Sequence, residues 1–126
     1  VENNKRRLVA FFQEAADRGE SVYGYGASTK GNVLLQYCEI TREQMPAIAE
    51  VNADKFGAFT PGTKIPILSE AEVRACQPDY MLVLPWHFRD GIIRREEAYL
   101  ARGGKLVFPL PELEIVAAKA TGRKAA

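Results

Sequence analysis

The run Tyr80-Met81-Leu82-Val83-Leu84-Pro85 is apolar throughout and stops at a proline. A strand covered by helices on both faces has this pattern, because neither side of it meets water. Proline ends such a strand since it has no N–H to donate to a neighbour. We therefore expect residues 80–84 to form a central strand of a parallel sheet.

Helical and extended patterns alternate on both sides of this strand. Residues 69–72, Ser-Glu-Ala-Glu, have the form of a capping box that opens a short helix. Apolar spacing predicts a helix over residues 92–100, ended by two glycines. Shorter apolar runs predict strands at the residues 65–68, 106–108 and 113–116.

The first half of the chain repeats the alternation. The spacing predicts a helix over residues 8–16, a strand over 21–26, a helix over 33–38 and a strand over 47–51. Parallel neighbours need right-handed crossovers, which helices supply. We expect an α/β fold, a Rossmann-like three-layer sandwich with a mostly parallel sheet of about five to six strands. Residues 1–116 would form this domain and residues 117–126 a flexible tail.

Composition narrows the possible partners. The chain has 126 residues, 47% of them apolar and 26% charged, as in an ordinary globular domain. A net charge of +1, without an arginine-rich face, argues against a nucleic-acid partner. No apolar stretch is long enough to span a bilayer, so we expect no membrane partner and a cytoplasmic protein. The start at Val1, without a methionine, is expected of a fragment of a longer polypeptide.

The cysteines and the histidine form no metal-binding pattern. Cys38 and Cys76 lie far apart, outside any CxxC spacing, and His87 is the only histidine. We expect both cysteines to be small buried hydrophobic residues and no metal site in this chain.

Residues 24–32, Gly-Tyr-Gly-Ala-Ser-Thr-Lys-Gly-Asn, form the first loop that could carry chemistry. Its glycines allow a tight turn, and Ser28, Thr29 and the free N–H groups of the next helix suit an anion, with Lys30 as a point charge. The alternative is purely structural: the glycines let a strand turn into a helix, Ser28 or Thr29 caps it, and Lys30 is solvated. The residue types alone leave both readings open.

Residues 54–64 form a second loop, rich in turn-forming residues. Phe56 and Phe59 could stack on a flat ring, while Lys55, Thr60 and Thr63 could bind phosphate or sugar oxygens. The alternative is an ordered crossover whose aromatic side chains cover the sheet edge.

Residues 85–90 follow the expected central strand. His87 could act as a general base or hydrogen-bond a ligand, and Arg89 could reach a phosphate. The alternative is that Trp86 and His87 pack over a helix N-terminus that Asp90 caps.

Several motifs in order carry a resemblance over nearly the whole chain. They are Gly24-Tyr25-Gly26-Ala27-Ser28-Thr29-Lys30-Gly31-Asn32, Asp54-Lys55-Phe56-Gly57, Thr60-Pro61-Gly62-Thr63, Ile65-Pro66 and Pro85-Trp86-His87-Phe88-Arg89. They resemble the C-terminal domain of the S-adenosylmethionine-dependent sugar C-methyltransferases that build branched deoxysugars. In that family a zinc-binding N-terminal domain and a middle domain that binds S-adenosylmethionine precede a Rossmann-like domain, which closes over a nucleotide-linked keto-sugar.

The resemblance also implies roles for individual residues. Ser28, Thr29, Lys30 and Asn32 would help to hold the nucleotide sugar. The loop residues Lys55, Thr60 and Thr63, together with Trp86, His87 and Arg89, would lie near the same crevice, with His87 as the candidate catalytic residue. The zinc, the methyl donor and the main catalytic base would belong to upstream domains of the same polypeptide, so this domain alone would be inactive. The reaction would remove a proton next to the sugar ketone, and the enolate carbon would attack the sulfonium methyl.

Two other functions fit the residues. The sheet could itself bind NAD or S-adenosylmethionine, with Asn52 or Asp54 near the ribose, although the loop has only Gly24 and Gly26 of the expected fingerprint. Alternatively, the domain could be a structural or dimerisation module. In that case, substitution of Lys30 or His87 would leave turnover unchanged.

Overall fold

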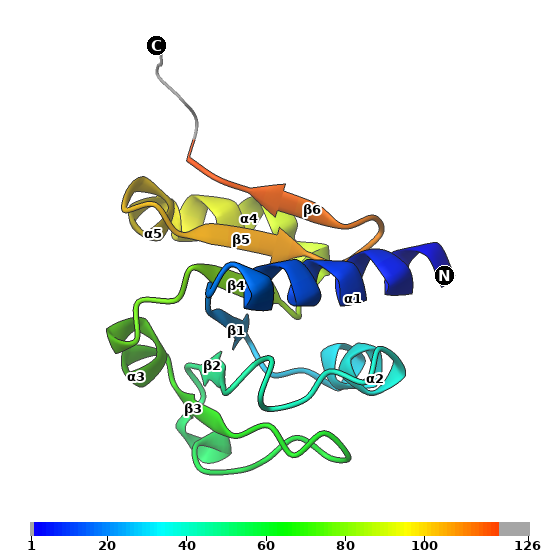
Figure 1. The fold of residues 1–126 in the computed structure, drawn as a ribbon. Coiled ribbons are helices and arrows are strands. Elements are labelled where there is room, and N and C mark those ends of the chain that lie inside the picture. Colours follow the sequence, from blue (N-terminus) through cyan, green and yellow to red (C-terminus); the bar gives the residue numbers. More distant parts are fainter. Residues whose placement is uncertain (1, 119–126) are drawn as a thin grey trace.

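Figure 1 shows the fold as a computed structural model, in which residues 2–118 are described. The elements follow the alternation expected from the sequence. The helices are α1 (Glu2–Asp17), α2 (Thr29–Tyr37), α3 (Glu70–Ala75), α4 (Arg89–Arg95) and α5 (Glu97–Ala101), with short 3-10 turns η1 (Ala53–Lys55) and η2 (Trp86–Phe88). The strands are β1 (Val22–Tyr25), β2 (Ile48–Glu50), β3 (Ile67–Ser69), β4 (Tyr80–Val83), β5 (Lys105–Phe108) and β6 (Glu114–Val116).

The strands form one sheet in the order β3-β2-β1-β4-β5-β6. All neighbouring pairs are parallel except β5 and β6, which are antiparallel. The α/β class and the mostly parallel sheet are therefore confirmed. The strand β4 lies between β1 and β5, and all four of its residues are buried, as its apolar run predicts. In this order the chain changes direction across the sheet between β1 and β4, the place where open α/β sheets bind their ligands.

Helices cover both faces of the sheet. The helices α1 and α2 share a buried cluster with one face, in which Leu8, Phe12 and Leu35 are almost fully buried. The helices α4 and α5 pack on the other face, and α3 joins them through Val73. In Figure 1, α1 crosses in front of the strands and α4 lies behind them.

The helix α1 is longer than its apolar stripe predicts. Leu8, Phe11, Phe12 and Ala15 form the buried stripe, but the helix begins at Glu2. The residues before Leu8 are polar and extend the helix without adding to the stripe, so hydrophobic periodicity does not reveal them. Gly19, with φ +70°, follows its end as expected.

The helix predicted over residues 92–100 is two helices. The backbone leaves helical geometry at Glu96, with φ −97° and ψ 21°. The Glu96 carboxylate is buried and accepts hydrogen bonds from Arg74 at 2.7 Å and from the Tyr25 hydroxyl at 2.8 Å. Both pieces bury the same face, so the apolar pattern continues through the break.

Two predictions about single residues had different outcomes. Ser69 and Glu72 form the predicted capping box of α3. The prediction that both cysteines are buried is right for Cys38, where burial raises the pKa of the thiol, and wrong for Cys76. Cys76 is exposed because it follows the last residue of α3, where the chain turns toward β4.

Within residues 2–118, no helix is long and apolar enough to cross a membrane. A flexible tail was predicted for residues 117–126, and residues 119–126 of it lie outside the described part of the chain.

Candidate functional site

The site lies where β1 and β4 end side by side. Two glycines bring the following loops close together. Gly26 has φ +78°, and a side chain there would lie 3.1 Å from the Pro85 ring. A Cβ on Gly31 would lie 2.6 Å from the Cβ of Leu84, so only glycine lets α2 start directly against the end of β4. The loop after β1 and the loop after β4 therefore meet at this end of the sheet, where Thr29, Lys30 and Trp86 line the end of a groove, and we call this junction the crevice.

The N-terminus of α2 opens toward this crevice. The Ser28 hydroxyl is the N-cap and accepts a hydrogen bond from the Gly31 N–H at 3.0 Å, as the structural reading of this loop proposed. The N–H groups of Thr29 and Lys30 have no acceptor within the helix, because a first helical turn always leaves its donors without partners. These donors and the helix dipole suit an anion.

Lys30 and His87 meet across the crevice. The Lys30 Nζ lies 3.5 Å from the His87 Nε2, and both side chains are exposed. A lysine only donates, so this hydrogen bond requires Nε2 of a neutral imidazole as its acceptor. The Trp86 ring stacks on the His87 ring, with centroids 4.9 Å apart and an angle of 12° between the planes. Asp90 does not cap α4, whose N-cap position is Phe88.

An apolar groove continues from this pair along α2. It has a volume of about 360 Å³. Its lining residues are Thr29, Lys30, Val33, Leu34, Tyr37, Trp86 and Leu110. Val33 is 59% exposed and Tyr37 is 43% exposed, so the groove is open to solvent along α2.

The threonine side chains of the second loop form hydrogen bonds to other residues of the chain. Thr60 is buried, and its hydroxyl accepts a hydrogen bond from the Ile65 N–H at 2.9 Å. It also bonds to the Thr63 hydroxyl, which donates to the Asn32 Oδ1 at 3.4 Å. This chain of hydrogen bonds attaches the loop to α2, and it occupies three side chains that the resemblance assigns to the substrate.

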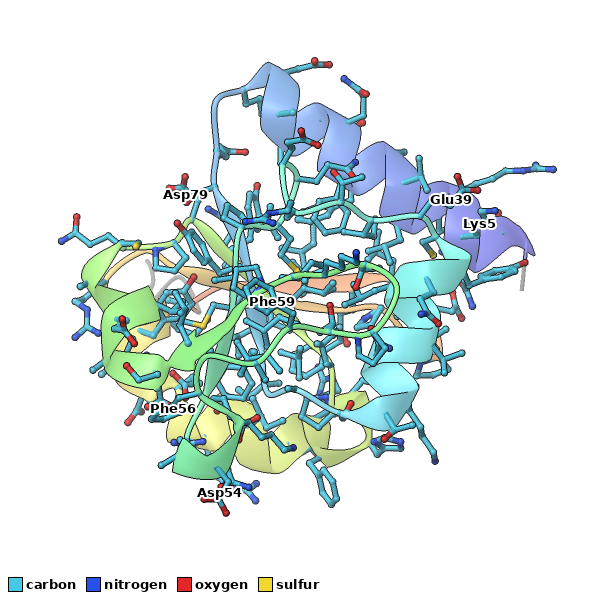
Figure 2. All side chains as sticks on the ribbon, turned by 90° about the horizontal axis from the view of Figure 1, so that it is seen from below. Lys5, Glu39, Asp54, Phe56, Phe59 and Asp79 are labelled. Carbon is cyan, nitrogen blue, oxygen red and sulfur yellow. The ribbon has the colours of Figure 1, made fainter. Side chains whose placement is uncertain are left out.

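The two phenylalanines of this loop are both exposed, Phe56 at 39% and Phe59 at 55%. Figure 2 shows Phe59 on the segment that crosses the view and Phe56 beside η1, near Asp54. They do not come together as one aromatic platform.

Lys55 and Glu50 hold the backbone of the first loop. The Lys55 Nζ donates to the Ala27 carbonyl at 3.2 Å and lies 4.0 Å from the Glu50 carboxylate. Glu50, at the end of β2, accepts hydrogen bonds from the N–H groups of Ala27, Val51 and Asn52 at 3.0, 3.2 and 3.0 Å. Glu50 was not among the residues predicted from the sequence, although a carboxylate inside the apolar run of residues 47–51 was a visible signal.

The position of Glu50 bears on ribose binding. In a dinucleotide-binding sheet, an acid near the end of the second strand binds the ribose hydroxyls. Here that carboxylate is only 8% exposed and is engaged by backbone donors, while the Asn52 Oδ1 accepts from the Asp54 N–H at 3.1 Å. These residues do not fit the ribose of NAD or S-adenosylmethionine in that mode.

Arg89, predicted to reach a phosphate, forms an ion pair with Glu114. Its guanidinium forms two hydrogen bonds to the Glu114 carboxylate, at 2.8 and 2.6 Å, and a third to Asp90. The Arg89 guanidinium lowers the pKa of Glu114. Arg89 thus connects the start of α4 to β6. Among residues 2–118, no group of three or more His, Cys, Asp or Glu side chains could hold a metal ion.

Comparisons with known proteins agree on one family. Residues 1–111 match the family described as the C-methyltransferase C-terminal domain. Over 103 residues the chain is 36% identical to the C-methyltransferase NovU of Streptomyces niveus. The match covers 82% of this chain and 24% of that relative, so the chain spans about a quarter of the relative's length.

Proposed function

Because the chain belongs to the C-methyltransferase C-terminal domain family, we propose that it holds the methyl acceptor of a longer methyltransferase that uses S-adenosylmethionine. The proposed acceptor is a nucleotide-linked keto-sugar. Its diphosphate would bind in the crevice between the ends of β1 and β4. The observation that carries this proposal is the approach of Lys30 to His87 beside the free N–H groups of α2.

The crevice has the chemistry of a diphosphate site. Lys30 supplies a fixed positive charge, and the N–H groups of Thr29 and Lys30 supply donors that the helix leaves unused. The Ser28 hydroxyl supports the site by capping α2 and does not face the ligand, since it is bonded to Gly31. An anion bound beside Lys30 would accept a charge-assisted hydrogen bond from its ammonium, and the His87 Nε2 would then lose its present donor.

His87 remains our candidate for proton transfer. Once the Lys30 ammonium has turned to the diphosphate, the Nε2 lone pair of a neutral imidazole can accept a proton from the carbon next to the ketone, assisting the main base of the upstream domains; alternatively, the ring orients the diphosphate through its Nδ1–H. Substitution by glutamine distinguishes these roles, because glutamine keeps a hydrogen-bonding group and removes the base. A fall in kcat alone would indicate proton transfer, and a rise in KM alone would indicate orientation.

The methyl donor and the zinc of the proposed enzyme would belong to upstream domains of the same polypeptide. Bound S-adenosylmethionine supplies an electrophilic methyl group. The groove along α2 is a suitable surface for the neighbouring domain, because Val33 and Tyr37 expose apolar area next to the proposed diphosphate site. Contact there would also exclude water from the crevice.

The two alternative functions make different predictions. An independent NAD-binding or S-adenosylmethionine-binding module needs a free acid near the end of β2, and Glu50 is engaged by three backbone donors. A purely structural or dimerisation module requires no cation at the crevice. It predicts that loss of Lys30 leaves substrate affinity unchanged.

The test is steady-state kinetics of the full-length enzyme carrying Lys30→Ala. Loss of a charge-assisted contact is worth about 1.5–3 kcal/mol, so we expect the KM for the nucleotide sugar to rise roughly tenfold to a hundredfold. The matched control is Lys105→Ala. Lys105 begins β5, which runs parallel to β4, so it lies at the other end of the strands from the crevice. An unchanged KM in the Lys30 variant would refute the proposed diphosphate site.

A further inference from the structure

We propose that Glu50 is a positioning residue that sets the direction of the anion-binding N–H groups of α2. The inference rests on the proposed function, and it adds a residue that does not touch the substrate. It is drawn from the contacts that Glu50 makes at the end of β2.

The carboxylate of Glu50 joins two loops. One oxygen accepts a hydrogen bond from the Ala27 N–H at 3.0 Å. Ala27 lies in the loop that follows β1, the strand next to β2. The other oxygen accepts the N–H groups of Val51 and Asn52, at 3.2 and 3.0 Å, where the chain leaves β2. With 8% of its surface exposed, Glu50 has little access to a ligand.

The peptide groups of Ala27 are held on both sides. Glu50 binds the N–H of Ala27, and Lys55 binds its carbonyl at 3.2 Å. Ala27 follows Gly26, whose φ of +78° is accessible mainly to glycine, and precedes Ser28, the N-cap of α2. The packing of Gly31 against Leu84 places the first turn of α2, but a glycine at position 26 leaves the peptide groups between β1 and the N-cap free to reorient. The contacts of Glu50 and Lys55 remove that freedom, so they determine where the N–H groups of Thr29 and Lys30 point.

The sign of a charge effect separates positioning from electrostatics. Glu50 is a negative group close to a proposed anion site, so its charge alone opposes diphosphate binding. Neutralising it without moving the loop would strengthen binding. Binding that becomes weaker after neutralisation must therefore come from a displaced loop.

The substitution Glu50→Gln makes this test with little change of shape. Glutamine has one acceptor oxygen instead of two, so it cannot serve both Ala27 and the Val51–Asn52 turn. We expect the 126-residue chain with Glu50→Gln to bind thymidine diphosphate about tenfold more weakly by calorimetry. The control is Glu70→Gln, a partly buried carboxylate on α3 whose partners are Arg74 and Arg95. It should lose stability without a change in affinity, and unchanged or stronger binding by the Glu50 variant would overturn the inference.

A second readout works without any ligand. In Glu50→Gln, amide exchange at Ala27 should become at least tenfold faster, and the amide resonances of Thr29 and Lys30 should shift, while Glu70→Gln leaves them unchanged. If the wild-type chain does not bind thymidine diphosphate but the exchange changes as expected, the proposed function fails and the positioning role stands. If exchange at Ala27 is unaffected, the positioning role fails whatever the affinity.

Discussion

Replacing Gly31 with alanine tests how closely α2 packs against the end of β4. The new Cβ would lie 2.6 Å from the Cβ of Leu84 and 2.9 Å from the Ser28 hydroxyl oxygen. Leu84 is almost fully buried, so it has no space to move away. The first turn of α2 must therefore shift away from the crevice.

The expected loss of stability follows from opposing terms. Alanine in place of glycine at an open helical position stabilises a protein by roughly 0.5–1 kcal/mol. Overpacking costs about 1–3 kcal/mol, and disturbing the Ser28 cap adds up to about 1 kcal/mol. We expect a net loss of about 1–2 kcal/mol for Gly31→Ala.

Urea unfolding followed by circular dichroism measures this loss. The midpoint for Gly31→Ala should fall by roughly 0.5–1 M. The control is Gly91→Ala, because Gly91 occupies the same third helical position in α4 and a Cβ there meets nothing within 4 Å. It should be neutral or gain up to about 1 kcal/mol. A Gly31 variant as stable as the Gly91 variant would refute the close approach of α2 to β4.

Three further predictions use the titrating groups and ion pairs of the fold. Cys76 should react with iodoacetamide in the native chain, whereas Cys38 should react only on unfolding, because burial shields its thiol and raises its pKa; mass spectrometry of alkylated peptides checks this. Burial raises the pKa of Tyr99 to about 12, so the folded state keeps a proton that the unfolded chain loses near pH 10. The contribution of the Tyr99 proton to folding stability is complete below about pH 10 and is lost as the pH rises toward 12. Unfolding measured at stepped alkaline pH should show this loss, and the loss should be smaller in Tyr99→Phe. Arg89 lowers the pKa of Glu114, so this ion pair is complete above the ordinary glutamate range and is lost as the pH falls through the lowered pKa. Arg89→Ala should therefore reduce the protection of the β6 amides from exchange at neutral pH, and acid should reduce the protection no further in this variant.

The order of elements was predictable because each strand and helix carries its own local signal. The apolar run before Pro85 identifies β4, and the Ser69–Glu72 capping box identifies the start of α3. Both signals arise within a few residues, and the structure confirms both.

The features that the sequence did not reveal depend on residues far apart in the chain. The break at Glu96 goes with contacts to Arg74 and Tyr25, 22 and 71 residues away. The apolar spacing of residues 92–100 does not reveal such contacts, because both helices bury the same face. The exposure of Cys76 likewise follows from where α3 stops, and helix ends are the least certain part of a sequence reading.

In the candidate site, too, some features follow from local motifs and others depend on residues far apart in the chain. The switch in strand order brings Lys30 to His87, and the loop motifs indicate both residues. The motifs do not show that Thr60 bonds within its own loop or that Arg89 holds Glu114, since residue type alone does not identify a hydrogen-bond partner. These side chains remain substrate-binding candidates only if the ligand displaces their present partners.

A nuclear magnetic resonance titration of the 126-residue chain shows whether a nucleotide sugar binds where β1 and β4 end. The ligand is a thymidine-diphosphate sugar, with S-adenosylmethionine and NAD in parallel samples. If the diphosphate binds between the ends of β1 and β4, the sugar nucleotide alone will shift the amides of Thr29 and Lys30 and the ring resonances of His87. Shifts caused by S-adenosylmethionine or NAD, or a sugar nucleotide that leaves these three residues unchanged, would contradict this binding site.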